Sequence, residues 1–217
     1  HGWGRTLEDF SQLASALSAA FPNYSFLQLD LPGFGGSPHS QESGFSLDDY
    51  ADSLNALFNK LEIGKVILVG HSLGGRISIK FAALFPERVE KMILISAAGI
   101  LSQSFRTIML AHGQKLFEAI FFAFRDSKFI LRLKNLFGRT FGSRDYQTSH
   151  GAVRETLKKV LGEDLRAAAQ KISIPTLLIW GKNDTITPLC DGEEYHSLIK
   201  RSRLEVLEGG HFIFLEN

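Results

Sequence analysis

Five consecutive residues, Gly70-His71-Ser72-Leu73-Gly74, fit the pattern G-x-S-x-G. The apolar stretch at 65–69 before them predicts a buried strand, and residues 75–85 after them predict a helix. A serine at such a strand-to-helix turn exposes its hydroxyl beside the unpaired N–H groups that open the helix. The pattern therefore predicts Ser72 as a nucleophile, with the Leu73 N–H placed to stabilise an oxyanion. An ordinary strand-to-helix turn is the alternative for these five residues taken alone.

A serine hydroxyl needs a base to take its proton and an acid to orient that base. Asp184 follows a predicted strand at 175–180, and His211 follows the last predicted strand at 203–207. The carboxyl ends of parallel strands meet at one edge of a sheet, so we expect Ser72, Asp184 and His211 to lie together. Asp191 is the alternative acid, but it falls where the next helix begins.

The order Ser, Asp, His is the chain order of α/β hydrolases, and four loops resemble that family in sequence and position. They are His1-Gly2-Trp3-Gly4, 30–37, Gly181-Lys182-Asn183-Asp184 and Gly210-His211-Phe212. The chain thus resembles an α/β-hydrolase-fold serine hydrolase over nearly its whole length. The resemblance implies that the Trp3 and Leu73 N–H groups form the oxyanion hole. It implies no metal and no organic cofactor, and a serine nucleophile argues against the dehalogenase and epoxide-hydrolase branches.

Strands and helices alternate along most of the chain, which predicts an α/β fold with a mostly parallel sheet covered by helices on both faces. We expect helices at 6–20, 46–61 and 191–200, and strands at 24–29, 65–69, 89–96, 175–180 and 203–207. Thr6 is expected to cap the first helix with Asp9 three residues later. Asp30 is expected to anchor the glycine-rich loop that follows it, and His1 to position the oxyanion loop.

Residues 101–170 interrupt the alternation with helical periodicity and no convincing strand. We therefore divide the chain into an α/β-hydrolase core at 1–100 and 171–217 and a helical cap subdomain at 101–170. The stripe formed by Phe117, Ile120, Phe121 and Phe124 is expected to pack against the core or to line an apolar pocket. The cap is rich in lysine and arginine, which is typical of a solvated face; contact with an anionic membrane surface is the alternative.

Composition limits the remaining classes. A net charge of +1 gives no reason to expect a nucleic-acid partner, and no apolar run is long enough to span a bilayer. The single cysteine, Cys190, excludes an internal disulfide and fits a cytoplasmic protein; we expect it to be a small packing residue. His71 is expected to point away from Ser72. The other histidines are interpreted as surface or cap residues without metal-ligand spacing: His39, His112, His150 and His196.

These observations predict a hydrolase that cleaves a small or medium carboxylic ester through an acyl-serine intermediate. The small-molecule substrate is expected to carry an apolar acyl or aromatic group. Two alternatives remain: carbon–carbon bond cleavage, hydrolytic or by a related lyase, and a ligand-binding receptor that retains a hydrolase pocket.

The start of the chain at His1 carries a separate expectation. The family's oxyanion loop follows the third strand, and that strand lies between the two that correspond here to 24–29 and 65–69. We therefore expect a fragment in which these two segments flank a strand-wide gap or pair directly. A fragment of this kind is expected to express poorly or to aggregate.

Overall fold

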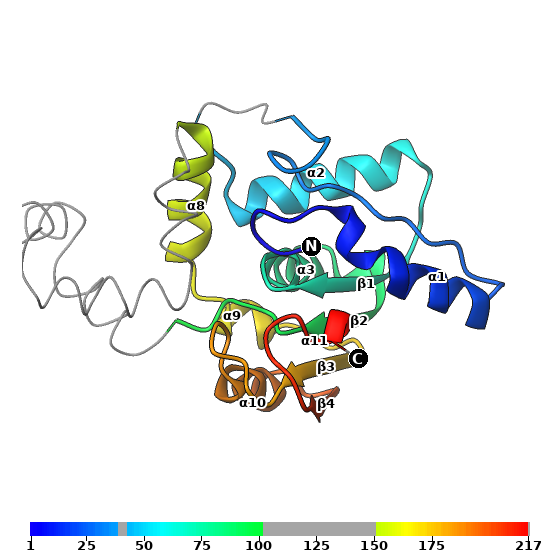
Figure 1. Cartoon of the computed structure of the whole chain (residues 1–217). Helices are drawn as coiled ribbons and strands as arrows, with labels where there is room; N and C mark the ends of the chain where they lie inside the picture. The colour runs from blue at the N-terminus through cyan, green and yellow to red at the C-terminus, as the bar shows by residue number, and fades with distance from the viewer. Residues whose placement is uncertain (39–42, 102–150, 217) are drawn as a thin grey trace, which may run out of the picture.

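The computed structural model describes residues 1–38, 43–101 and 151–216 (Figure 1). Its centre is a four-stranded parallel sheet in the order β1-β2-β3-β4. The strands are β1 (Val66–His71), β2 (Val89–Ile95), β3 (Thr176–Gly181) and β4 (Ser202–Leu207). Each lies within two residues of its predicted position, so the predicted α/β class and the parallel sheet are confirmed. All four strands therefore place their carboxyl ends at the same edge.

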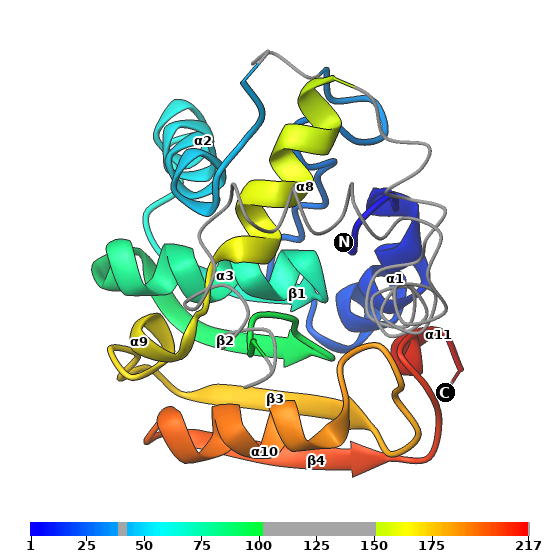
Figure 2. The same ribbon diagram turned by 90° about the vertical axis from the view of Figure 1, so that its left-hand side faces the viewer.

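Helices alternate with the strands as expected. The described helices are η1 (Leu7–Phe10), α1 (Ser11–Ala20), α2 (Leu47–Lys60), α3 (Leu73–Leu84), η2 (Pro86–Arg88), α8 (Ala152–Gly162), α9 (Arg166–Ala169), α10 (Leu189–Leu198) and α11 (Ile213–Glu216). Helices α2, α3, α9 and α10 pack in a row, each against the next. Figure 2 shows α3, α9 and α10 lying along the sheet. The two ends of the chain meet where Phe10 of η1 stacks on Phe214 of α11, with ring centroids 4.9 Å apart.

The core lies between the sheet and this row of helices. Its largest fully buried side chains include Tyr50 of α2, Phe81 of α3, Leu94 of β2, Trp180 of β3 and Tyr195 of α10. Burial of such side chains is the main favourable term in folding. Their packing fixes the two central strands, β2 and β3, and hence the sheet edge where the candidate site lies.

The predicted helix at 6–20 forms, but its predicted cap is wrong. Thr6 makes no side-chain capping bond. The Leu7 N–H, which opens η1, instead donates to Asp30 Oδ1 at 2.7 Å. Asp30 Oδ2 accepts from the Gly36 N–H at 2.8 Å, so Asp30 anchors its own loop as expected. A carboxylate is the stronger acceptor, and it displaces the local hydroxyl from this role.

The predicted strand at 24–29 is also wrong. Residues 25–30 have no assigned strand or helix, and Tyr24 and Leu27 remain 52% and 50% exposed. This segment does not pair with β1, and β2 is the single strand partner of β1 among the described residues. The aromatic and aliphatic residues of 24–29 indicate a preference for burial, whereas a strand also needs a neighbouring row of N–H and C=O groups.

The two ends of the long insertion meet at one place. The Leu165 N–H donates to Gly99 O, and Arg166 Nη1 donates to Leu101 O, both at 3.0 Å. Arg166 is itself held by ion pairs with Asp164 and Glu194. The chain therefore leaves the sheet after β2 and returns to it at nearly the same point.

Helix α8 lies within residues 101–170, the predicted cap, and is bound to the rest of the fold (Figure 2). Its Thr156 Oγ1 accepts from the Phe45 N–H at 2.8 Å, and Lys159 Nζ donates to Gly44 O at 2.9 Å. The stripe at 117–124 and the basic residues of 102–150 lie outside the described residues. The division into a core at 1–100 and 171–217 and a cap at 101–170 stays a prediction.

Candidate active site

Ser72 lies in a strained turn between β1 and α3. Its φ of 51° and ψ of −107° lie in a backbone region that residues other than glycine rarely adopt. The turn is tied to the neighbouring strand by the Ser72 N–H, which donates to Ile95 O at 3.1 Å. Glycine is required beside it, because a Cβ on Gly70 would lie 2.4 Å from Gly74 O. The sharp turn at Ser72 predicted from the pentapeptide is therefore present in the structure.

Asp184 and His211 meet at the carboxyl ends of β3 and β4. His211 Nδ1 lies 2.9 Å from Asp184 Oδ2, and both side chains are almost fully buried. Asp184 Oδ1 accepts from the Ile186 and Thr187 N–H groups at 2.8 and 2.9 Å. Burial alone would raise the pKa of Asp184. The hydrogen bond and charge of His211 and these two N–H donors outweigh it, so the net pKa is lowered and the carboxylate stays ionised.

Ser72 and His211 are linked through the side chain of His71 and are not hydrogen-bonded to each other. Among the described residues, no hydrogen bond joins Ser72 Oγ to the imidazole of His211. His71, the residue before Ser72, places its Nε2 2.9 Å from His211 O. Bonds between a nucleophile and its base are often long in a free enzyme and tighten when substrate binds. The geometry thus brings together the acid and base directly, and the nucleophile as their neighbour.

The loop His1-Gly2-Trp3 lies against the nucleophile turn. The Gly74 N–H donates to His1 O at 3.0 Å, and a Cβ on Gly2 would lie 3.6 Å from Ser72 Cβ. His1 Nε2 accepts from the Leu31 N–H at 2.9 Å, so this ring holds the loop from the other side, as expected. The loop that carries the Trp3 N–H is therefore fixed beside the first turn of α3.

Beside the Ser72 turn, Trp3 contributes a packed ring and Leu73 contributes a helix-opening N–H. The Trp3 ring packs edge-on against Phe34 with centroids 5.0 Å apart, which agrees with the packing interpretation of that side chain. The Leu73 N–H is the first of α3, and the first N–H groups of a helix have no partner within it. The assignment of both N–H groups to an oxyanion hole stays a prediction.

The alternative candidates lie elsewhere. Asp191 is in the first turn of α10, and burial followed by repulsion from Glu194 raises its pKa to about 7. His196 bonds to Ser202 on the surface, and Cys190 is exposed, which corrects its interpretation as a packing residue. His39, His112 and His150 lie outside the described residues. No group of three metal-ligating side chains occurs within the described ranges.

Thr187 takes part in the site, although the sequence analysis did not single it out. Its Oγ1 lies 2.8 Å from Asp184 Oδ2, 3.2 Å from His211 Nδ1 and 3.2 Å from Ser96 O. A threonine three residues after an aspartate is a local turn pattern that could have suggested the contact with the carboxylate. The contacts with His211 and Ser96 depend on residues remote in sequence.

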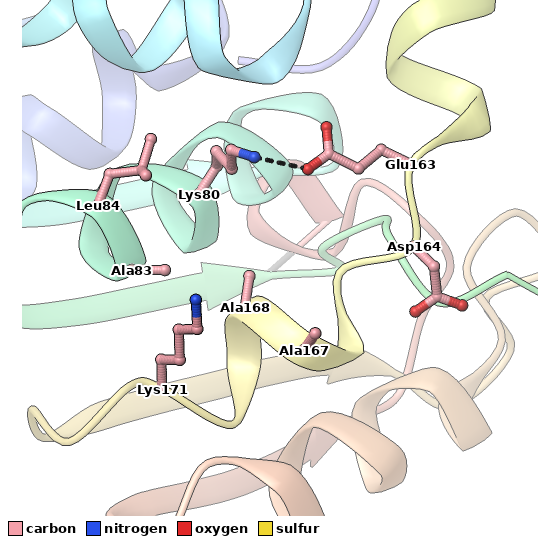
Figure 3. A pocket seen from close by; sticks show the side chains of 8 residues that line it. All are labelled: Lys80, Ala83, Leu84, Glu163, Asp164, Ala167, Ala168 and Lys171. Atoms are coloured by element: carbon pink, nitrogen blue, oxygen red, sulfur yellow. Dashed lines mark hydrogen bonds and ion pairs between the residues drawn. The ribbon is translucent and has the colours of Figure 1, made fainter.

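A pocket of about 180 Å³ lies beside the distal half of α3, away from Ser72 (Figure 3). It is lined by Lys80, Ala83, Leu84, Glu163, Asp164, Ala167, Ala168 and Lys171. Lys80 Nζ spans it to Glu163 at 2.8 Å. The pocket contains none of the three predicted catalytic side chains.

No helix in the described part of the chain is long and apolar enough to cross a membrane.

Comparison with known proteins places this geometry in a family. The sequence matches the family described as alpha/beta hydrolase fold over residues 1–217. The chain is an α/β hydrolase. A 2-hydroxy-6-oxononadienedioate/2-hydroxy-6-oxononatrienedioate hydrolase of Klebsiella pneumoniae is 30% identical to it, over 97% of this chain and 76% of that protein. A pimeloyl-acyl-carrier-protein methyl ester esterase of Neisseria meningitidis is 28% identical, over 100% and 71% of the two chains.

Solved structures agree on the α/β-hydrolase fold. An esterase from Exiguobacterium antarcticum superposes with a TM-score of 0.71 at 24% identity, covering 100% of this chain and 84% of the other. A bromoperoxidase from Bacillus anthracis also gives a TM-score of 0.71 at 24% identity, covering 99% and 84%. These similarities support the fold.

Proposed function

We propose that this α/β hydrolase cleaves a small or medium carboxylic ester through an acyl-serine intermediate. The proposal depends above all on the strained turn at Ser72 beside the hydrogen bond between His211 Nδ1 and Asp184 Oδ2. Ser72 Oγ is the nucleophile, His211 the general base and Asp184 the group that orients it. The Leu73 and Trp3 N–H groups hold the oxyanion. No cofactor or metal takes part in this scheme.

The reaction proceeds in two halves. Ser72 Oγ attacks the ester carbonyl while its proton passes to His211 Nε2, and the same proton is then given to the departing alkoxide. Water repeats the sequence on the acyl-serine and releases the acid. Asp184 stays ionised throughout and stabilises the imidazolium, which agrees with its lowered pKa. We further propose that the cap at 101–170 lines the acyl pocket and gives it an apolar character.

Carbon–carbon bond hydrolysis is the second candidate. It is favoured by the 30% identity to the Klebsiella pneumoniae hydrolase, whose name specifies a 2-hydroxy-6-oxo substrate. The same three side chains would serve both reactions, so the substrate panel must separate them. A receptor that retains the pocket is the candidate from outside enzymology, and it predicts binding without turnover.

The test begins with a fluorophosphonate probe, which labels an activated serine without knowledge of the substrate. We expect one adduct, on Ser72, that is absent from Ser72→Ala. Turnover is then measured on a panel of carboxylic esters, thioesters and vinylogous diketones. Ester turnover that is lost in Ser72→Ala supports the main proposal, diketone cleavage alone supports the second candidate, and an adduct on another residue refutes both.

A further inference from the structure

His71 stands between the nucleophile and the base, and the proposed mechanism gives it no task. It ends β1, directly precedes Ser72 and is completely buried. Its Nε2 lies 2.9 Å from the main-chain O of His211. Its ring centroid lies 4.7 Å from that of His211, and 4.9 and 5.2 Å from those of Phe214 and Phe212. One side chain thus contacts both the main chain and the ring of the proposed base.

The hydrogen bond determines the tautomer of His71. A carbonyl oxygen only accepts, so Nε2 carries the hydrogen and Nδ1 carries a lone pair. Nδ1 is buried and has no partner among the described residues, and a Cβ on Gly2 would lie 3.2 Å from it. Burial, followed by repulsion from His211, lowers the pKa of His71 to about 3. The ring is therefore neutral at working pH and carries no catalytic proton.

We propose that His71 is a positioning residue that ties the loop of His211 to the nucleophile turn. This inference rests on the proposed roles of Ser72 and His211. Asp184 and Thr187 contact the ring of the base from the loop after β3, and His71 bonds to its main chain from the end of β1. The loop before His211 is also tied by the Asn183 N–H, which donates to Gly209 O at 2.9 Å, and by Glu216, which accepts from the Gly210 N–H at 2.8 Å.

Two variants separate the hydrogen bond from the shape of the side chain. His71→Phe keeps an aromatic ring against its neighbours but removes the Nε2–H donor. His71→Gln keeps an amide N–H that can reach His211 O. The rate of fluorophosphonate labelling of the whole protein is measured against probe concentration at several pH values. Two quantities are taken from each curve: the maximal labelling rate and the probe concentration that gives half of it. Thermal unfolding shows that each variant is folded.

We expect the maximal labelling rate to fall by roughly 10- to 100-fold in His71→Phe, because a misplacement of about 1 Å costs that much. The half-maximal concentration should change less than about threefold, and His71→Gln should recover most of the rate. In a plot of labelling rate against pH, the acid side should show a single ionisation in the native protein, His71→Phe and His71→Gln, because His71 does not titrate there.

Several results would overturn the inference while Ser72 still labels in the native protein. They are a native rate in His71→Phe, an equal loss in both folded variants, or the disappearance of an ionisation when His71 is replaced. Failure of the native protein to label at Ser72 would instead overturn the proposed function. The two failures are therefore distinguishable in one experiment.

Discussion

Replacing His71 with glutamine should change how the stability of the protein depends on pH. The pKa of His71 is lowered from 6.5 to about 3 in the folded chain. Between these values the unfolded chain binds a proton that the folded chain excludes. The stability contributed by the neutral ring is therefore complete above pH 6.5 and is lost as the pH falls toward 3. Each pH unit in this window costs about 1.4 kcal/mol, or about 3 kcal/mol from pH 6.5 to pH 4.

Asp191 contributes a slope of the opposite sign. Its pKa is raised from 3.8 to about 7, so here the folded chain binds the proton that the unfolded chain has released. This contribution is complete below pH 3.8 and is lost as the pH rises through about 7. In the native protein the two slopes largely cancel between pH 4 and 6.5. Each single variant should reveal the slope of the other residue.

Urea denaturation at several values between pH 4 and 7 measures this directly. Relative to the native protein, the free energy of unfolding of His71→Gln should decline with rising pH by about 3 kcal/mol across the window. Asp191→Asn should show a rise of similar size, and the double variant should show neither. Curves for His71→Gln and the native protein that stay parallel over this range would refute the reasoning.

Three further predictions concern the site. Asp184→Asn should lower kcat about 10⁴-fold because the imidazole loses its orientation and tautomer, whereas Asp191→Asn should change it little; a reversed order in steady-state assays would identify the other acid. Thr187→Val removes one of the donors to Asp184 and should cost about 1.5 kcal/mol in the free energy of unfolding at pH 7, with Thr187→Ser largely native in urea denaturation; equal losses would point to packing. Gly181→Ala places a Cβ 2.2 Å from Gly210 O and should lower the melting temperature, and an unchanged melting curve would contradict the rigidity of that contact.

The sequence predicted best the elements whose signals are local. The strand before Ser72, its sharp turn and the helix after it all follow from neighbouring residues. The helix at α2 likewise begins at Ser46, where Asp49 completes a reciprocal cap. The loops after β3 and β4 could be located because a strand end predicts a sheet edge.

Errors arose where a remote residue decides the outcome. Leu7 takes its capping acceptor from Asp30, 23 residues away, which no local pattern at Thr6 reveals. The segment at 24–29 has strand-forming residues, but pairing depends on a neighbour. The roles of Thr187 and His71 depend on contacts across loops that only the folded chain brings together.

The junction at Gly99 and Leu165 has a consequence for how this protein can evolve. The Leu165 N–H donates to Gly99 O at 3.0 Å. The segment between these two residues therefore forms a closed loop, whatever its length. Doubling a closed loop costs only about 0.6 kcal/mol. Changes in chain length between Leu101 and Gly151, outside the tied helix α8, therefore disturb the sheet and its carboxyl edge little. Selection can therefore change that segment while the sheet edge that carries Ser72, Asp184 and His211 is inherited unchanged.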